Sequence, residues 1–235
     1  MRVTVLELPA RWGEPAAALA DVEAVLARGP ETDLVVLPEM ALTGYVSAAG
    51  DFDLRPFAEA TDGPTASAAS ALAARRHVNL LAPLVLKEGD RFYNAVALFG
   101  RGGERLATYR KRHPWFPETW ASAGPEAPPV VEIEGVLVTI AICFDVHFLE
   151  ADTARELARS ELLLFPSAWV DPEDTRVELL AELAQKFDLH VAAANWAPGV
   201  VRLPGQGGSC VLAPSGTVLA AVAPGESRAD ADLRT

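Results

Sequence analysis

Cys143 stands at the end of an apolar run and is the residue of this chain best suited to covalent chemistry. The run, Val136 to Ile142, is rich in β-branched and aliphatic residues, and a helix-starting segment follows at 144–150. This pattern predicts a buried strand that breaks into a sharp turn. Such a turn exposes the side chain and directs backbone N–H groups, that of Phe144 first, at the bond under attack. A cysteine here is either a small core residue or a nucleophile.

Three charged residues lie where they could activate that thiol. Glu39 follows an apolar run and a proline, Lys111 ends another predicted strand, and Glu118 lies in a proline- and aromatic-rich loop at 113–129. A free thiol is mostly protonated at neutral pH, so a base or a cation must favour the thiolate. A glutamate in a closed pocket serves as base and then acid, and a lysine stabilises an oxyanion. If the strand ends converge, this set needs no histidine.

Other residues near the thiol have competing interpretations. Asp145 is favoured as a helix N-cap rather than a reactive acid. His147, four residues after Cys143, suggests a Cys–His dyad, but on a turn entering a helix it is expected to pack or to face solvent. Cys210 lies in an alternating strand and is expected to be a plain core residue.

The amino-acid composition argues against several classes of binding partner. The 235 residues carry 20 Lys and Arg against 32 Asp and Glu, a formal charge of −12. This balance argues against nucleic acid, because phosphate binding needs a basic face. No apolar run approaches a membrane span, and the amino-terminal residues lack the apolar centre of a signal peptide. Two cysteines cannot form a disulfide framework, which indicates a cytoplasmic protein. No Cys/His spacing resembles a zinc site, so neither a metal nor a cofactor is expected.

The elements that must position these residues alternate between strands and helices. Strands are predicted at 2–8, 33–37, 79–87, 92–99, 104–110, twice within 130–142, and at 162–166, 190–195, 207–213 and 217–222. Helices are predicted at about 14–28, 64–77, 148–160 and 171–187, the last started by Asp171-Pro172-Glu173-Asp174. Without a linker or repeat, residues 1–235 form one α/β domain in which layered sheets pack on one another, with a loose tail at 225–235.

Several segments, in this order, resemble the nitrilase superfamily of carbon–nitrogen hydrolases. They are Leu37-Pro38-Glu39 with Thr43-Gly44-Tyr45, Tyr109-Arg110-Lys111, Ile142-Cys143-Phe144-Asp145, Phe165-Pro166-Ser167-Ala168-Trp169, Ala193-Ala194-Asn195 and Gly207-Gly208-Ser209. The resemblance covers almost the whole chain. It implies a four-layer αββα sandwich with two mixed β-sheets packed face to face and helices outside.

The resemblance also implies roles. Glu39 would be the general base and acid, Lys111 the oxyanion-stabilising cation and Cys143 the nucleophile. Glu118 is similar to the second glutamate of the family, which positions the substrate, and the loop around it is nearest to that of aliphatic amidases. The Phe144 N–H would complete the oxyanion hole. The candidate substrate-binding residues are Tyr45, Trp115, Trp169 and Asn195.

The expected function is hydrolysis of non-peptide C–N bonds. An amidase acting on a small amide or N-carbamoyl compound through a cysteine thioester is favoured. The alternatives are a nitrilase that attacks C≡N and a non-catalytic binding module that retains the fold. A homodimer or larger homo-oligomer is the expected assembly, although the strand and tail with which many relatives cross a dimer are not recognised after the closing hairpin.

Overall fold

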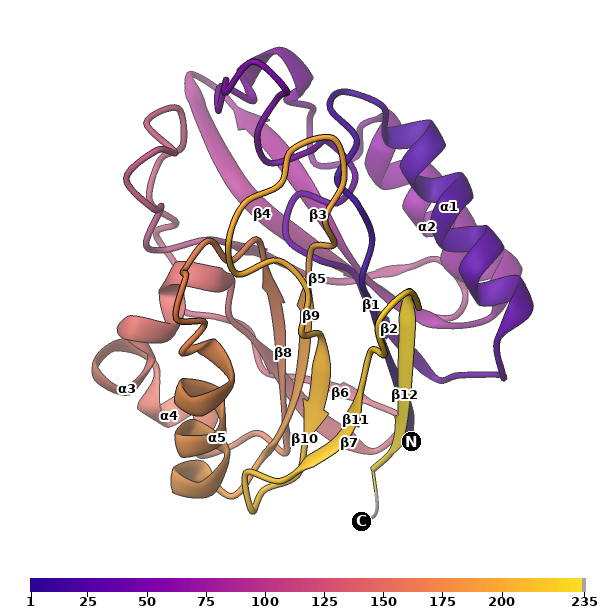
Figure 1. Cartoon of the computed structure of the whole chain (residues 1–235), viewed down its shortest axis with the longest axis vertical. Coiled ribbons are helices and arrows are strands. Elements are labelled where there is room, and N and C mark those ends of the chain that lie inside the picture. Colours follow the sequence, from indigo (N-terminus) through magenta and orange to yellow (C-terminus); the bar gives the residue numbers. More distant parts are fainter. Residues whose placement is uncertain (234–235) are drawn as a thin grey trace.

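Two six-stranded mixed sheets form the centre of the computed structural model, which describes residues 1–233 (Figure 1). The first sheet has the order β12 (Arg228–Asp232), β1 (Arg2–Leu6), β2 (Leu34–Val36), β3 (Asn79–Glu88), β4 (Arg91–Phe99) and β5 (Arg105–Arg110). The second has the order β11 (Val218–Ala221), β10 (Cys210–Leu212), β9 (His190–Asn195), β8 (Leu162–Ser167), β7 (Val136–Ile140) and β6 (Val131–Ile133). In both sheets two parallel pairs lie at the centre and antiparallel strands lie toward the edges.

Helices cover the outer faces of the sheets (Figure 1). They are α1 (Pro15–Arg28), α2 (Pro64–Arg76), α3 (Leu149–Asp152), α4 (Ala154–Leu157) and α5 (Arg176–Phe187), with 3₁₀ turns at Arg55–Phe57 and Cys143–His147. α1 and α2 start with a proline at the first turn, where a missing N–H costs nothing. Within residues 1–233 no helix is both long and apolar enough to cross a membrane.

The main core lies between the sheets. Val5 and Val36 from the first sheet share one buried cluster with Val138 and Ile140 from the second. A separate cluster joins α1 and α2 to the other face of the first sheet. Strands covered on both faces are apolar along their length, which explains the uninterrupted hydrophobic runs. The four-layer αββα arrangement is therefore confirmed.

Two helices differ from the prediction. The segment 171–187 becomes helical only at Arg176, because Asp171 forms a local turn first: its carboxylate accepts hydrogen bonds from the Glu173 N–H (3.1 Å) and the Thr175 hydroxyl (3.2 Å). The predicted helix at 148–160 is interrupted at Thr153, which separates α3 from α4.

The tail is the clearest correction. Residues 225–235 were predicted to be loose, but β12 pairs antiparallel with β1 over five residues, from Arg2 with Asp232 to Leu6 with Arg228. Ala229 and Ala231 point into the core between the sheets, and Arg2 forms an ion pair with Asp232. A further strand thus follows the closing hairpin. Residues 234 and 235 of that prediction lie outside the described part.

Candidate active site

The two sheets bring the predicted site residues together from opposite sides. Glu39 follows β2 and Lys111 follows β5, both in the first sheet, whereas Cys143 follows β7 in the second. All three are buried, with 1%, 1% and 7% of their surface exposed, respectively, and Glu118 reaches the same place from the loop after β5. The sequence therefore identified one cluster from four separate segments.

Lys111 forms the centre of this cluster. Its Nζ donates to Glu39 Oε1 and to Glu118 Oε1, each at 2.7 Å. An ammonium group has three N–H donors, so two carboxylates leave one donor for a further oxygen. Burial alone would lower the pKa of Lys111, but the two carboxylates outweigh it and hold that pKa above its ordinary value. The lysine stays charged.

Two further side chains hold the carboxylates in place. Asn94, on β4, donates through Nδ2 to Glu39 Oε1 (2.7 Å) and to Glu118 Oε2 (3.3 Å). The Tyr45 hydroxyl donates to Glu118 Oε1 at 3.0 Å. Burial raises the pKa of Glu118, and Lys111 opposes that shift. The sequence analysis missed Asn94, although a polar residue inside the apolar run of β4 was the available signal.

Cys143 sits on a strained turn. Its φ of +47° is in the left-handed region, which costs a non-glycine residue about 1–3 kcal/mol. The 3₁₀ turn 143–147 starts at this residue, so the N–H of Phe144 lies next to the sulfur. The predicted strand-to-turn elbow is present.

Asp145 has the capping role that the sequence favours over a reactive acid, but it acts from the third position of the turn, where its carboxylate closes a capping box with the N-cap residue Ile142. Its buried carboxylate accepts hydrogen bonds from the Tyr109 hydroxyl (2.9 Å), the His113 N–H (2.9 Å) and the Ile142 N–H (3.1 Å). Tyr109 and His113 flank Lys111 in the sequence. Asp145 thus fastens the lysine segment to the cysteine segment.

The backbone N–H of Ala168 joins the thiol to Glu39. It donates to Glu39 Oε2 at 2.8 Å, and its polarity also lowers the pKa of the Cys143 thiol. Burial, followed by the charge of Glu39, raises the pKa of the Cys143 thiol well above its ordinary value, and Lys111 opposes the shift only in part. The resting thiol is therefore protonated, with a carboxylate beside it.

A pocket of about 160 Å³ opens onto the sulfur. Its walls are Trp115, Phe144, His147, Ala168, Trp169, Val170, Asp171 and Thr175. The predicted pocket residues Trp115 and Trp169 are both among them. His147 also lines it, and its ring packs against those of Phe144 and Trp169. The volume is below the roughly 300–1,000 Å³ typical of drug-sized ligands, so the pocket suits a small molecule.

The other two predicted substrate-binding residues lie elsewhere. Tyr45 is 3% exposed and supports Glu118. Asn195 is fully buried: Oδ1 accepts from the Trp169 N–H and Ser167 hydroxyl, and Nδ2 donates to Gly205 and Gly207 carbonyls. Because protein groups already occupy its amide, Asn195 orients the Trp169 segment instead of facing the pocket.

Cys210 lies in the core, 2% exposed. Among residues 1–233, no group of three His, Cys, Asp or Glu side chains is arranged to hold a metal ion.

Comparisons with known proteins agree with this geometry. A hydrolase encoded in the pqqF 5′ region of Pseudomonas protegens is 33% identical, over 94% of this chain and 78% of its own length. An (R)-stereoselective amidase from a Pseudomonas species is 28% identical, over 93% and 80%. The solved NitN amidase of Nesterenkonia sp. AN1 is 28% identical with a TM-score of 0.86, covering 100% of this chain and 93% of that one.

One structure of the Nesterenkonia amidase shows acrylamide added to its active-site cysteine, and a mutant form was solved with butyramide. A model of the carbon-nitrogen hydrolase family matches residues 2–233 of the present chain. The chain therefore belongs to the carbon-nitrogen hydrolase family, within the nitrilase superfamily that its motifs resemble.

Proposed function

We propose that this carbon–nitrogen hydrolase is an amidase that cleaves small amides through a thioester on Cys143. The observation that carries the proposal is the position of Glu39, which is hydrogen-bonded to the Lys111 ammonium and to the Ala168 N–H and whose charge acts on the Cys143 thiol. A protonated thiol needs a base within reach, and the effect of the Glu39 charge on the Cys143 pKa supports Glu39 in that role.

In the first half-reaction the Glu39 carboxylate takes the proton from the Cys143 thiol as the sulfur attacks the amide carbonyl carbon. A C–S bond forms, and the carbonyl π electrons move onto oxygen. The third N–H of Lys111 and the N–H of Phe144 stabilise this oxyanion. When the oxyanion collapses, the C–N bond breaks, and the nitrogen leaves as ammonia or an amine with the proton held by Glu39.

The second half-reaction regenerates the enzyme. Glu39 removes a proton from water, the hydroxide adds to the thioester, and the C–S bond breaks to release the carboxylic acid. The sulfur regains its proton from Glu39. In this mechanism Glu118 keeps Lys111 in place throughout, as its 2.7 Å bond to the lysine supports, and it helps to position the substrate.

Small amides are the favoured substrates. The pocket is small, and Trp115, Phe144 and Trp169 give its wall an apolar surface. The Nesterenkonia amidase, whose chain follows this one throughout, has been solved with butyramide. The homo-oligomer and the cytoplasmic location stay predictions.

The test is an ammonia-release assay with butyramide, butyronitrile and N-carbamoyl-β-alanine, followed by mass spectrometry of the intact protein. We expect ammonia from the amide and an acyl adduct that Cys143→Ala abolishes. Ammonia from the nitrile alone would make the enzyme a nitrilase. Full activity in Cys143→Ala would refute the mechanism, and an unreactive thiol with every compound would favour a binding module.

A further inference from the structure

The pocket at Cys143 carries negative but no positive side-chain charge. Asp171 is its charged lining residue, and none of the described lining residues is Lys or Arg. The Asp171 carboxylate is fixed in the wall by the Glu173 N–H and the Thr175 hydroxyl. It is half-buried and retains lone pairs for a donor in the pocket.

His147 does not supply the missing positive charge. Burial lowers its pKa from the ordinary 6.5, with Asp171 acting against that shift, so the imidazole is uncharged at neutral pH. Behind the thiol, two carboxyl groups, Glu39 and Glu118, face the single ammonium of Lys111. Among the described lining residues of the pocket, therefore, none offers a positive charge to a substrate carboxylate.

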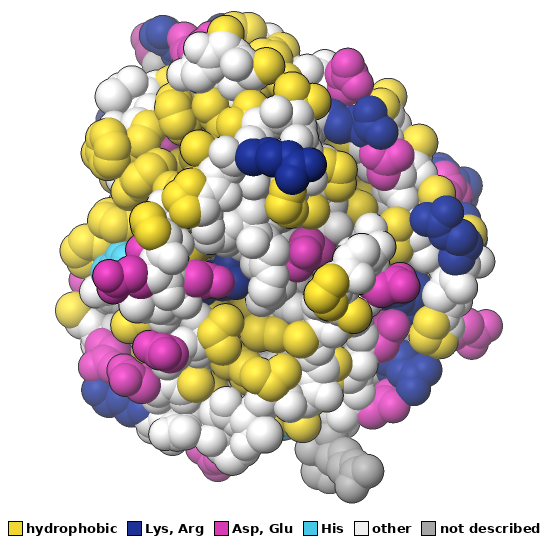
Figure 2. Space-filling model, viewed as in Figure 1, with side chains coloured by type: hydrophobic (Ala, Val, Ile, Leu, Met, Phe, Trp, Pro, Cys, Tyr) yellow, Lys and Arg dark blue, Asp and Glu magenta, His cyan; other side chains and the backbone are white. Residues whose placement is uncertain are grey.

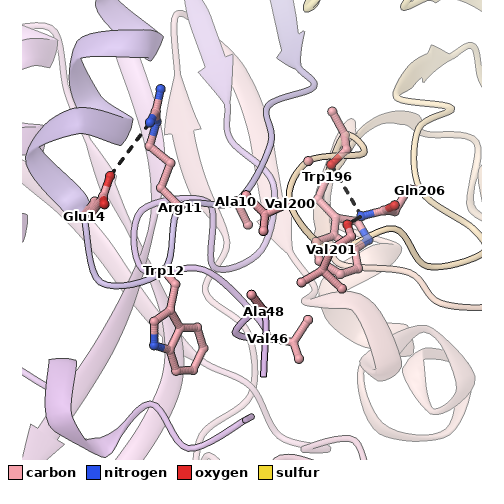
Figure 3. A pocket seen from close by; sticks show the side chains of 12 residues that line it. Ala10, Arg11, Trp12, Glu14, Val46, Ala48, Trp196, Val200, Val201 and Gln206 are labelled. Carbon is pink, nitrogen blue, oxygen red and sulfur yellow. Dashed lines mark hydrogen bonds and ion pairs between the residues drawn. The ribbon is translucent and has the colours of Figure 1, made fainter. Parts of the chain in front are cut away.

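Arg112 and Arg176, which neighbour the site segments in the sequence, are not among the pocket's lining residues. Arg112 pairs with Asp152, and the fully buried Arg176 donates to the Gly207 and Gly208 carbonyls beside Asp174. Arg11 belongs to a second pocket, of about 260 Å³, where its side chain points to Glu14 and away from Trp196 (Figure 3). On the face shown in Figure 2, acidic side chains lie between the basic ones.

From this distribution we infer that the enzyme selects its amides by charge, with Asp171 as the specificity-determining residue. It accepts acyl chains that are neutral or end in an ammonium group, and it rejects chains that end in a carboxylate. The inference rests on the proposed amidase function and narrows it to the non-anionic amides. It excludes ureido acids and the monoamides of dicarboxylic acids as good substrates.

The physical reason is direct. A substrate carboxylate entering the pocket would lose water without gaining a counter-ion, and would approach a fixed carboxylate. A substrate ammonium would instead gain Asp171 as its partner. At contact distance in a water-filled mouth, one unit charge changes a rate or affinity by about fivefold.

A first experiment separates this inference from the proposed activity, because it does not need turnover. The whole protein is treated with iodoacetamide and, in parallel, with iodoacetate, which match in size and differ in charge. Peptide mass spectrometry gives the rate at Cys143, and 2-mercaptoethanol gives the intrinsic ratio of the two reagents. We expect the preference of Cys143 for iodoacetamide to exceed that ratio about tenfold at low salt, and to shrink as salt screens the charges.

Two variants locate the effect. Asp171→Asn keeps an acceptor for the Glu173 N–H and should reduce the preference about fivefold. Glu173→Gln removes one acidic charge two residues away, on an exposed side chain outside the pocket, and should change it less than twofold. A wild-type ratio equal to that of the free thiol, or an equal response of both variants, would overturn the inference.

A second experiment uses turnover of three amides of matched length: butyramide, 3-aminopropanamide and succinamate. We expect kcat/KM to be lowest for succinamate, and Asp171→Asn to narrow its gap to 3-aminopropanamide about fivefold or more. Efficient hydrolysis of succinamate would leave the amidase proposal standing and refute charge selection.

Discussion

Removing the Lys111 ammonium should strongly destabilise the folded protein, because two buried carboxyl groups would lose their counter-ion. In Lys111→Met, Glu39 and Glu118 would face one another in a site where neither carboxyl is exposed. Breaking a buried ion pair by removing one partner costs about 3–5 kcal/mol, and here a single lysine serves two carboxylates. We therefore expect the free energy of unfolding to fall by at least about 3 kcal/mol at pH 7.

The stability of the Lys111→Met variant should depend on pH, in a direction that follows from the two carboxyl groups. Two adjacent carboxyls without a cation share one proton, so the folded-state pKa of the pair rises above the unfolded value of about 4.3. A group whose pKa is raised by folding stabilises the folded state at low pH and loses that contribution as pH rises through the raised pKa. The variant should therefore regain part of the lost stability on going from pH 7 to pH 5.

Urea unfolding followed by tryptophan fluorescence measures both effects, since the chain has five tryptophans. Lys87→Met is the matched control, because it removes the same charge from an exposed lysine and should cost less than about 0.5 kcal/mol at either pH. Adding Glu118→Gln to Lys111→Met should restore part of the loss at pH 7. Wild-type stability for Lys111→Met at pH 7, or a loss that grows at pH 5, would refute the charged arrangement.

Three further predictions concern the parts around this cluster. Asp145→Asn leaves one buried donor of Tyr109, His113 or Ile142 unpaired, so we expect about 1–3 kcal/mol lower stability in urea unfolding and kcat about 10- to 100-fold lower. Tyr45→Phe removes one support of Glu118; kcat/KM should fall up to about tenfold, and a double-mutant cycle with Glu118→Gln should be non-additive. Because burial raises the Cys143 pKa, its alkylation rate by iodoacetamide should keep increasing from pH 7 to 10; a plateau near pH 7 would contradict that.

The sequence predicted most strands because those strands are covered on both sides. Short apolar runs such as β2 and β8 are typical of buried strands, and a proline lies at or near the end of each. β12 was not predicted as a strand because its residues, Arg-Ala-Asp-Ala-Asp, present only two alanines to the core. Its pairing with β1 is a contact between residues some 230 positions apart, which local pattern does not encode.

The predicted start of α5, at residue 171, was wrong for a different reason. Asp171, Pro172 and Glu173 favour the first turn of a helix, but the same aspartate also favours a side-chain turn, and packing of the pocket wall selected the turn.

Site residues with a chemical signature were predictable, and those that act through neighbours were not. Cys143, Glu39 and Lys111 carry reactive groups at strand ends, so type and position pointed the same way. Asn94, Asp145 and Asn195 matter through hydrogen bonds to segments distant in the sequence. Only the folded chain reveals which donors they meet, so neither the bonds of Asp145 to Tyr109 and His113 nor the structural role of Asn195 is predictable from the sequence.

Because the site is divided between two sheets, its residues are not assembled until the two sheets pack together. Glu39 and Lys111 follow strands of one sheet and Cys143 follows a strand of the other. The two sides are joined by hydrogen bonds from the Ala168 N–H to Glu39 and from Tyr109 to Asp145. Until the sheets dock, Cys143 is an ordinary cysteine without an activating partner. The cluster of Glu39, Lys111 and Cys143 exists only when both sheets are docked, so the proposed amide hydrolysis requires the fully packed core.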